Sequence, residues 1–307
     1  MTTTELSLFI REQAHLLGFD SCGFAQANAL PKQSQLDFEV WLNDGLQGEM
    51  SYLGRNLDKR MDPGLLVEGC KSIVMVALNY FPLGNQLPTA LKVAKFAYGL
   101  DYHFIIRGKL NQLMDRIREQ GITVNGRAFS DSAPIMERHW AWEAGLGWLG
   151  KNQNLIIPGN GSYFLLGELL IDLDLDYGTP MEDRCGICDK CLQACPTKAL
   201  DGKRLDARRC LSYLTIEKKG PFSKEEAKMV GENNWIFGCD ICQDVCPWNR
   251  FATANSTAEL QPTEHFLNLD HAKFLKLNTA SFQTYFSGTC IERTCLEGLQ
   301  RNMAAKA

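Results

Sequence analysis

The spacing of hydrophobic positions predicts two amphipathic helices and a strand in the first part of the chain. Apolar residues recur at helical spacing over residues 5–17 and 106–120, and each segment is closed by a glycine, Gly18 or Gly121. The run IVMVAL at residues 73–78 is short, apolar and rich in β-branched side chains, so it predicts a buried strand.

The segments that follow continue this mixture of helix and strand. Residues 123–129 predict a strand, and residues 134–144 predict a helix with a proline in its first turn. Residues 155–157 and 163–171 flank the sequence Pro-Gly-Asn-Gly, which predicts a β-hairpin. Because no βαβ repeat is present, we expect an α+β fold here.

The character of the sequence changes after the acidic segment 172–180, where cysteine, lysine and arginine become frequent. Short helical segments follow further along the chain. We therefore expect an α+β domain over residues 1–175, a cysteine-rich domain over 176–255, and a helical tail over 256–307 that packs on the other two.

Composition and charge narrow the class of protein. The chain has 307 residues, 45% of them hydrophobic and 22% charged, as in globular proteins. A net charge of −4 argues against general polyanion binding. The N-terminus lacks the basic and apolar regions of a secretory signal, and no apolar run reaches the roughly 18–20 residues of a membrane span. We expect a soluble, cytoplasmic protein with no membrane partner.

Twelve cysteines require an explanation, because disulfides are rare in a reducing compartment. Eight of them lie between residues 185 and 246. The other four, Cys22, Cys70, Cys290 and Cys295, we interpret as small hydrophobic residues.

The first cysteine motif is C-x2-C-x2-C-x3-C-P, starting at Cys185. This is the bacterial ferredoxin spacing, in which three thiolates bind one cluster and the fourth, here Cys195, binds its neighbour. Thiolates are soft ligands that suit iron–sulfur clusters or zinc. Zinc ribbons use two separated C-x2-C pairs, so the motif favours clusters.

The second motif is C-x2-C-x3-C-P, starting at Cys239, and it is one cysteine short. Ile236 occupies the position of the missing ligand, and Cys210 is the one unassigned cysteine between the motifs. The predicted ligands of the first [4Fe–4S] cluster are Cys185, Cys188, Cys191 and Cys246. The predicted ligands of the second are Cys195, Cys210, Cys239 and Cys242.

Two adjacent clusters form an electron path, so the N-terminal domain is expected to hold a redox cofactor or a reducible substrate. Its densest polar stretch is residues 131–138, followed by the glycine-rich residues 144–152. Asp131 precedes a predicted helix and could simply cap it, which is worth about 1 kcal/mol. The glycines could approach a flat cofactor, or they could mark a helix end and a turn.

Several segments together carry a family resemblance over nearly the full length. They are residues 48–53 with Arg55, 98–103, 131–138, 147–152, 210–217 and 239–249, the first cysteine motif, and the tail from 282 to 302. With these segments in order, the chain resembles the epoxyqueuosine reductases, which are cobalamin-dependent iron–sulfur enzymes of tRNA modification.

The resemblance implies reduction of epoxyqueuosine to queuosine at the wobble position of tRNA, the last step of queuosine biosynthesis. It implies a nitroreductase-like cobalamin-binding domain followed by a bacterial-type two-cluster ferredoxin domain. The implied cofactors are cobalamin and two [4Fe–4S] clusters. The partners would be a tRNA anticodon stem-loop and a low-potential electron donor, and we expect a monomer.

The resemblance also assigns residues. Asp131 looks like the proton donor, which requires a raised pKa that burial could provide and that a helix N-terminus would oppose. The implied cobalamin contacts are Arg55, Tyr98, Asp131, Lys151, Asn152, Ser212 and Tyr213. Apart from Asp131, each of these has an alternative role as a surface charge or packing side chain. His103 is interpreted as structural.

Residues 184–228 form a locally basic region, with eleven Lys or Arg against six Asp or Glu, a difference of +5. This excess is compatible with docking of one RNA stem-loop through its phosphates. It also offsets the charge of anionic clusters. The candidate RNA-binding residues are Arg208, Arg209, Lys218 and Lys219.

Two other functions remain open from the sequence. A cobalamin-dependent reductive dehalogenase of a small organohalide would normally carry an export signal, which the N-terminus lacks. A plain electron-transfer ferredoxin leaves Asp131 and the large N-terminal domain unexplained.

Overall fold

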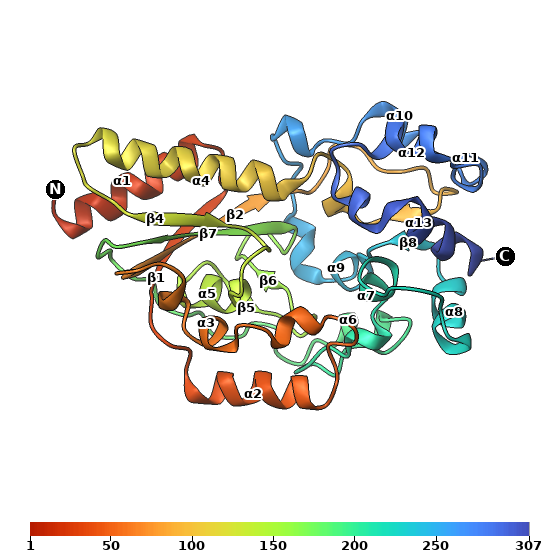
Figure 1. Ribbon diagram of the computed structural model, residues 1–307, viewed down its shortest axis with the longest axis horizontal. Helices are drawn as coiled ribbons and strands as arrows, with labels where there is room; N and C mark the ends of the chain where they lie inside the picture. Colours follow the sequence, from red (N-terminus) through yellow and green to blue (C-terminus); the bar gives the residue numbers. More distant parts are fainter. Residues whose placement is uncertain (307) are drawn as a thin grey trace.

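A four-stranded antiparallel sheet organises the first half of the protein, whose computed structural model describes residues 1–306 (Figure 1). The strands lie in the order β1 (Ser21–Gln26), β2 (Ser72–Asn79), β7 (Phe164–Ile171) and β4 (Gly126–Phe129). β2 is buried along its whole length and β7 along nearly all of it, because both faces of the sheet are covered.

Helices α1 (Thr3–Leu16) and α4 (Tyr102–Glu119) cover one face of this sheet (Figure 1). Their apolar stripes, which include Ile10 and Ile106, pack against Val74 and Leu169 of the central strands. The other face is covered by α5 (Glu137–Glu143), with α3 (Leu57–Met61) and α2 (Lys32–Asn43) further out.

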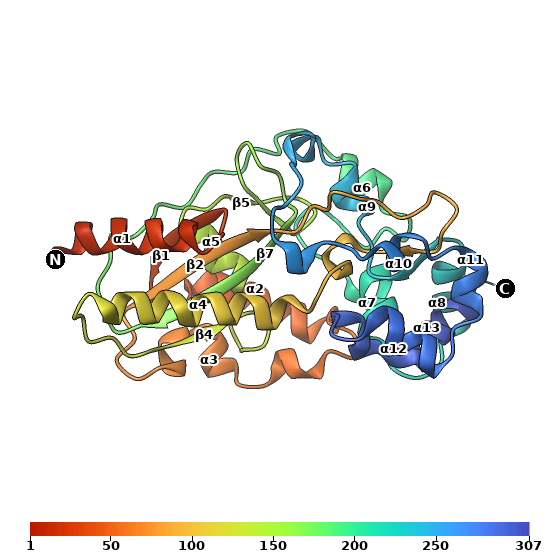
Figure 2. The same ribbon diagram turned by 90° about the horizontal axis from the view of Figure 1, so that it is seen from above.

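The second half of the protein consists mainly of short helices. Those between the sheet and the tail are α6 (Lys190–Ala194), α7 (Leu211–Ile216), α8 (Lys224–Gly231) and α9 (Ile241–Asp244). The tail contains α10 (Glu264–Leu267), α11 (His271–Leu275), α12 (Thr279–Phe286) and α13 (Cys295–Ala304). These tail helices gather at the end of the molecule opposite the N-terminus (Figure 2).

The two halves share a core. Strand β3 (Lys92–Val93) pairs in parallel with β8 (Trp235–Phe237), although their sequence positions are far apart. Tyr98 and Ile236 lie in one hydrophobic cluster with the tail helices. Residues 91–98 belong to the expected N-terminal domain but pack with the C-terminal half. The domain boundaries expected from the sequence stay a proposal.

The α+β expectation is confirmed, and the predicted elements at 5–17, 73–78 and 106–120 are found as α1, β2 and α4. The strand predicted at 123–129 is present but shorter, as β4. Among residues 1–306, no helix is both long and apolar enough to cross a membrane.

Two local predictions are wrong. The hairpin does not form, because β6 (Leu155–Ile156) pairs with β5 (Trp148–Leu149) while β7 pairs with β2 and β4. Because β7 lies between β2 and β4, both of its edges are already paired and none is left for β6. The helix predicted from residue 134 begins at Glu137 instead, after a bend that includes Asp131.

Candidate active site and cysteine cavities

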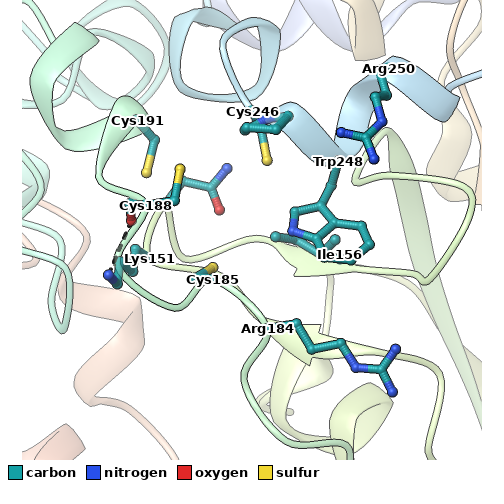
Figure 3. Close-up of a pocket in the computed structure, with 11 residues that line it drawn as sticks. Lys151, Ile156, Arg184, Cys185, Cys188, Cys191, Cys246, Trp248 and Arg250 are labelled. Atoms are coloured by element: carbon teal, nitrogen blue, oxygen red, sulfur yellow. Dashed lines mark hydrogen bonds between the residues drawn. The ribbon is translucent and has the colours of Figure 1, made fainter.

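Four cysteines from the two motifs surround a cavity of about 220 Å³. They are Cys185, Cys188, Cys191 and Cys246, the set predicted for the first cluster. Their sulfur atoms point toward a common space (Figure 3). The last cysteine of the second motif thus joins three from the first, because α6 and α9 pack together.

Lys151 holds the loop that carries the first two of these cysteines. Its ammonium group donates hydrogen bonds to the carbonyl of Gly186 at 2.6 Å and to that of Cys188 at 3.0 Å. One wall of the cavity is aromatic, where Trp248 packs edge-on against Trp148 with ring centroids 4.7 Å apart. The family resemblance implied that Lys151 contacts cobalamin. In the structure, Lys151 lies beside the first cysteine set.

A second cavity of about 340 Å³ is lined by the other four motif cysteines. They are Cys195, Cys210, Cys239 and Cys242, the set predicted for the second cluster. Cys210 reaches this cavity from the residue just before α7. Ile236 is fully buried in the core of the C-terminal half, where an apolar side chain packs well.

The two cavities adjoin at Asn152, which lines both of them. Its side chain is buried, and its amide donates to the carbonyl of Cys242 at 3.3 Å. Ser212, another predicted cofactor contact, lines the second cavity from α7. The cysteine sets therefore lie on neighbouring hollows with one shared wall residue.

The second cavity extends from its cysteines to the sheet. Tyr102, at the start of α4, and Arg138, on α5, are part of its wall. Most of the remaining wall is apolar or aromatic and comes from both halves, including Tyr80, Phe96, Phe164, Leu165 and Leu205. The thiols at one end of this cavity fit a cluster, and its apolar and aromatic wall offers a surface on which part of an organic cofactor could pack.

Asp131 lies next to this cavity, because the hydroxyl of Tyr102 donates to its carboxylate at 2.9 Å. The side chain is 56% exposed, so the carboxylate opens to solvent. The backbone has a φ of 50°, the left-handed region that non-glycine residues rarely adopt. The N-cap of α5 is Met136, so the interpretation of Asp131 as a helix cap is wrong.

His103 lies on the other side of this carboxylate. Its Nε2 is 3.6 Å from Asp131 Oδ2, and its Nδ1 is 2.5 Å from Asp101 Oδ1. Burial lowers the pKa of His103, but the two carboxylates outweigh it and the pKa lies above its ordinary value. The two carboxylates thus favour the charged form of His103, a role that the sequence did not assign to it.

The same contacts decide the charge of Asp131. Burial alone would raise the pKa of Asp131, but hydrogen bonds from His103 and Tyr102 outweigh burial and hold the pKa below its ordinary value. This lowered pKa belongs to the protein without cobalamin or substrate, so the raised pKa expected beneath a corrin and a bound base stays a prediction. His103, whose pKa is raised, lies beside this carboxylate.

Two further carboxyls near Asp131 were missed by sequence reasoning. The backbone N–H of Asp131 donates to the carboxylate of Glu137, the first residue of α5. Burial, followed by the charge of Asp131, raises the pKa of Glu137 to about 7. Glu168 is fully buried in β7, and burial raises its pKa well above the ordinary value. The signal in the sequence was a lone glutamate inside the apolar run 164–171.

The two predicted tyrosine contacts lie in packed surroundings. Tyr98 is buried against Phe266, with ring centroids 4.9 Å apart, and lines neither cavity. The hydroxyl of Tyr213 accepts the backbone N–H of Glu49 at 2.7 Å. Gly48 lies under this ring, where an added Cβ would come within 2.5 Å of the phenol oxygen. Both side chains thus have the packing role that the sequence left open.

The four candidate RNA-binding residues differ in how far neighbouring groups already bind their side chains. Arg208 is bound to Asp206 at 2.8 Å, and Lys218 is bound to the carboxylate of Glu49. Arg209 donates to the carbonyl of Thr197 at 2.8 Å, while Lys219 is exposed. Arg55, the remaining predicted cofactor contact, is exposed after the 3-10 helix Ser51–Gly54.

Comparisons with known proteins agree with this arrangement of cysteines. A family model described as "4Fe-4S double cluster binding domain" matches residues 184–249, which contain all eight motif cysteines. A second model, described as "Epoxyqueuosine reductase QueG, DUF1730", matches residues 60–132 and so includes Asp131. The chain therefore carries a domain of the double 4Fe–4S type.

Whole-length relatives give the same family. An epoxyqueuosine reductase of Leadbetterella byssophila is 45% identical over 296 residues, which are 96% of each chain. A solved epoxyqueuosine reductase with an epoxyqueuosine-modified tRNA stem loop has a TM-score of 0.86 and 29% identity, covering 98% of this chain and 80% of the other. The Bacillus subtilis enzyme, solved with its catalytic loop swung out of the active site, has a TM-score of 0.85 and 28% identity, covering 98% and 81%. This chain belongs to the epoxyqueuosine reductase family.

Proposed function

We propose that this protein is an oxidoreductase that reduces epoxyqueuosine to queuosine at the wobble position of tRNA, the last step of queuosine biosynthesis. The observation that carries the proposal is one continuous arrangement of groups. Two cysteine-lined cavities meet at Asn152, and the second extends to Tyr102, whose hydroxyl binds Asp131. Electrons and a proton can therefore be supplied at one place.

The eight cysteines of the two cavities are assigned to two [4Fe–4S] clusters. The first cluster would be held by Cys185, Cys188, Cys191 and Cys246, and the second by Cys195, Cys210, Cys239 and Cys242. Support comes from the ferredoxin spacing and from the separation of these two sets into two neighbouring cavities. A low-potential electron donor would load the clusters from outside.

Cobalamin is assigned to the second cavity, on the side of Tyr102 and Arg138. When bound and reduced, it supplies a strong nucleophile or a low-potential electron. The apolar and aromatic lining fits a flat macrocycle, and Asn152 and Ser212 offer polar contacts at the wall. Lys151 lies at the first cavity instead, where it would support the first cluster by binding the loop that carries Cys185 and Cys188.

Removal of an epoxide oxygen as water consumes two electrons and two protons. Asp131 is assigned as the group that hands a proton to the substrate, and His103 as the group that refills it across 3.6 Å. Tyr102 orients the Asp131 carboxylate through its hydrogen bond. In the Bacillus subtilis relative, the catalytic loop is swung out of the active site. By analogy, the segment around Asp131 would move into and out of the site.

The substrate partner is assigned as a tRNA anticodon stem-loop, by analogy with the relative that was solved with such a stem loop. The exposed Asp131 carboxylate marks the opening at which the modified base would enter. Three of the candidate RNA contacts pair with a carboxylate: Arg208 with Asp206, Lys218 with Glu49, and Arg209 with Glu225 at 3.7 Å. Within residues 1–306, Lys219 forms no such pair and is exposed, so it is the better phosphate contact.

The remaining assignments follow from the family. Residues 1–175 would form a nitroreductase-like cobalamin domain, 176–255 a ferredoxin domain, and 256–307 a tail packed on both. The protein would act in the cytoplasm, where its tRNA substrate is found, and it would act as a monomer.

The direct test is anoxic reconstitution with iron, sulfide and cobalamin, followed by addition of a chemical reductant and epoxyqueuosine-containing tRNA. Mass spectrometry of the digested nucleosides should show loss of one oxygen atom from the modified base. Unchanged tRNA, in a sample whose spectrum shows bound and reduced cobalamin, would overturn the proposal.

A further inference from the structure

Glu168 is an acidic residue in the middle of an apolar sheet. It is fully buried on β7, and its neighbours across the adjacent strands are Met75 on β2 and Phe129 on β4. Within residues 1–306, no N–H group, hydroxyl or cationic side chain donates a hydrogen bond to either carboxyl oxygen. An unpaired carboxylate in such a place costs several kcal/mol, so the group must be neutral or tied to a partner.

Helix α5 packs against β7, and its first residue, Glu137, brings a second carboxyl to Glu168, with which it forms a side-chain hydrogen bond. Two carboxyls in contact cannot both ionise easily, so such a pair holds one proton between them. The other charged groups that act on the pair are Asp131 and Arg138, and Arg138 also donates to the carbonyl of Gln153. The sheet contributes apolar neighbours.

Glu137 connects this pair to the active site. Its carboxylate accepts the backbone N–H of Asp131, the residue that adopts the left-handed conformation. A residue with a Cβ rarely adopts that conformation, so a contact must hold it. It is also the conformation in which the Asp131 side chain meets Tyr102 and His103.

We propose that Glu168 and Glu137 form a positioning relay, in which neutral Glu168 donates its O–H to Glu137 and Glu137 holds the N–H of Asp131. The relay keeps the Asp131 carboxylate in contact with Tyr102 and His103. It rests on the proposed function only for the role of Asp131 as proton donor. Both glutamates act through Asp131 and touch neither substrate nor cofactor.

The first test reads the shared proton. Infrared spectra of the protein at pH 8 should contain a protonated-carboxyl band that disappears in Glu168→Gln and Glu168→Leu. The matched control is Glu143→Gln, which changes the glutamate at the other end of α5 and should keep the band. Absence of the band in the unaltered protein, or its persistence in both Glu168 variants, would overturn the relay.

The second test reads the position of Asp131. In Glu137→Ala, hydrogen exchange of the Asp131 amide should become about tenfold faster or more, because its acceptor is lost. Unchanged exchange would contradict the inference. Neither this measurement nor the infrared spectrum needs substrate, so both remain informative if the protein leaves epoxyqueuosine unreduced and the proposed function fails.

The third test uses turnover. Glu168→Gln retains an N–H donor and should keep kcat within about threefold. Glu168→Leu should lower kcat by about tenfold or more, because a misplaced acid slows the chemical step, and should leave KM for tRNA unchanged. The leucine variant should fold, since an apolar side chain suits the site. Equal kcat in Glu168→Leu and the unaltered protein would refute the relay.

Discussion

Asp131 and His103 form the smallest unit of the proposed chemistry. The carboxylates of Asp101 and Asp131 favour the charged form of His103, and the Asp131 carboxylate faces the opening. We therefore expect the two side chains to share the proton supply that the family resemblance assigned to Asp131 alone. A base bound over Asp131 would remove water from the carboxylate and so favour its protonated form. Proton delivery would then be coupled to substrate binding.

Replacement of the acid tests its assignment. Asp131→Asn keeps the shape but cannot donate an acidic proton, so turnover should fall by about 10²–10⁴-fold while the cobalamin spectrum stays unchanged. Asp174→Asn, at an exposed carboxylate paired with Lys71, is the matched control and should retain activity. Full turnover by the Asp131 variant with cofactor bound would remove it from the mechanism.

The charge on His103 predicts a pH dependence of stability. Because its pKa is raised in the folded protein, its contribution is fully present below the ordinary value of 6.5 and is lost as pH rises through the raised value. His103→Gln should therefore lower the free energy of unfolding more at pH 6 than at pH 9. Urea titrations at both pH values check this, and an equal loss at both would contradict the assigned charge.

At the scale of elements, hydrophobic spacing located α1, β2 and α4, because each contributes one clear apolar face or run to the core. Spacing could not show that β7 pairs with β2 and β4, since strand partners depend on the whole sheet. The cysteine sets were predictable because the ferredoxin motif has a fixed spacing and its fourth cysteine binds the neighbouring cluster. Glu168 was not, because its partner Glu137 is 31 residues away in the sequence.

The turn between β6 and β7 offers a test at this scale. Gly161 has a φ of +88°, and an added Cβ would come within 2.2 Å of Asn249 Oδ1. Gly161→Ala should therefore lower the free energy of unfolding by more than the roughly 1–2 kcal/mol of left-handed strain alone. Gly159→Ala is the control, with a φ of +76° and no atom within 4 Å. Equal losses in the two variants would show that the contact with Asn249 is unimportant.

At the scale of the whole molecule, a chain with a net charge of −4 must bind an anionic RNA through local cations. Lys219→Glu should weaken binding of the stem-loop and reduce the salt dependence of affinity by about one unit of slope or more. Lys276→Glu, an equally exposed change after α11, should alter neither. Binding curves at several salt concentrations decide, and an unchanged slope for Lys219→Glu would place the RNA elsewhere.

Both halves of the chain are needed for the proposed site. The second cavity takes wall residues from the sheet domain and from the cysteine domain, and residues 91–98 share a core with the tail. Electron supply and substrate reduction would thus be built into one structural unit, with Asn152 at the junction between the cysteine sets.

The assignment of eight cysteines to two clusters is the claim on which the electron path depends, and Cys210 is its least obvious member. Iron and sulfide analysis of anoxically reconstituted protein should give about eight irons per chain, and about four in Cys210→Ala. Cys290→Ala, at a buried cysteine outside both cavities, should keep about eight. A colourless protein that contains only zinc, or a Cys210 variant with the full iron content and an unchanged spectrum, would contradict the account.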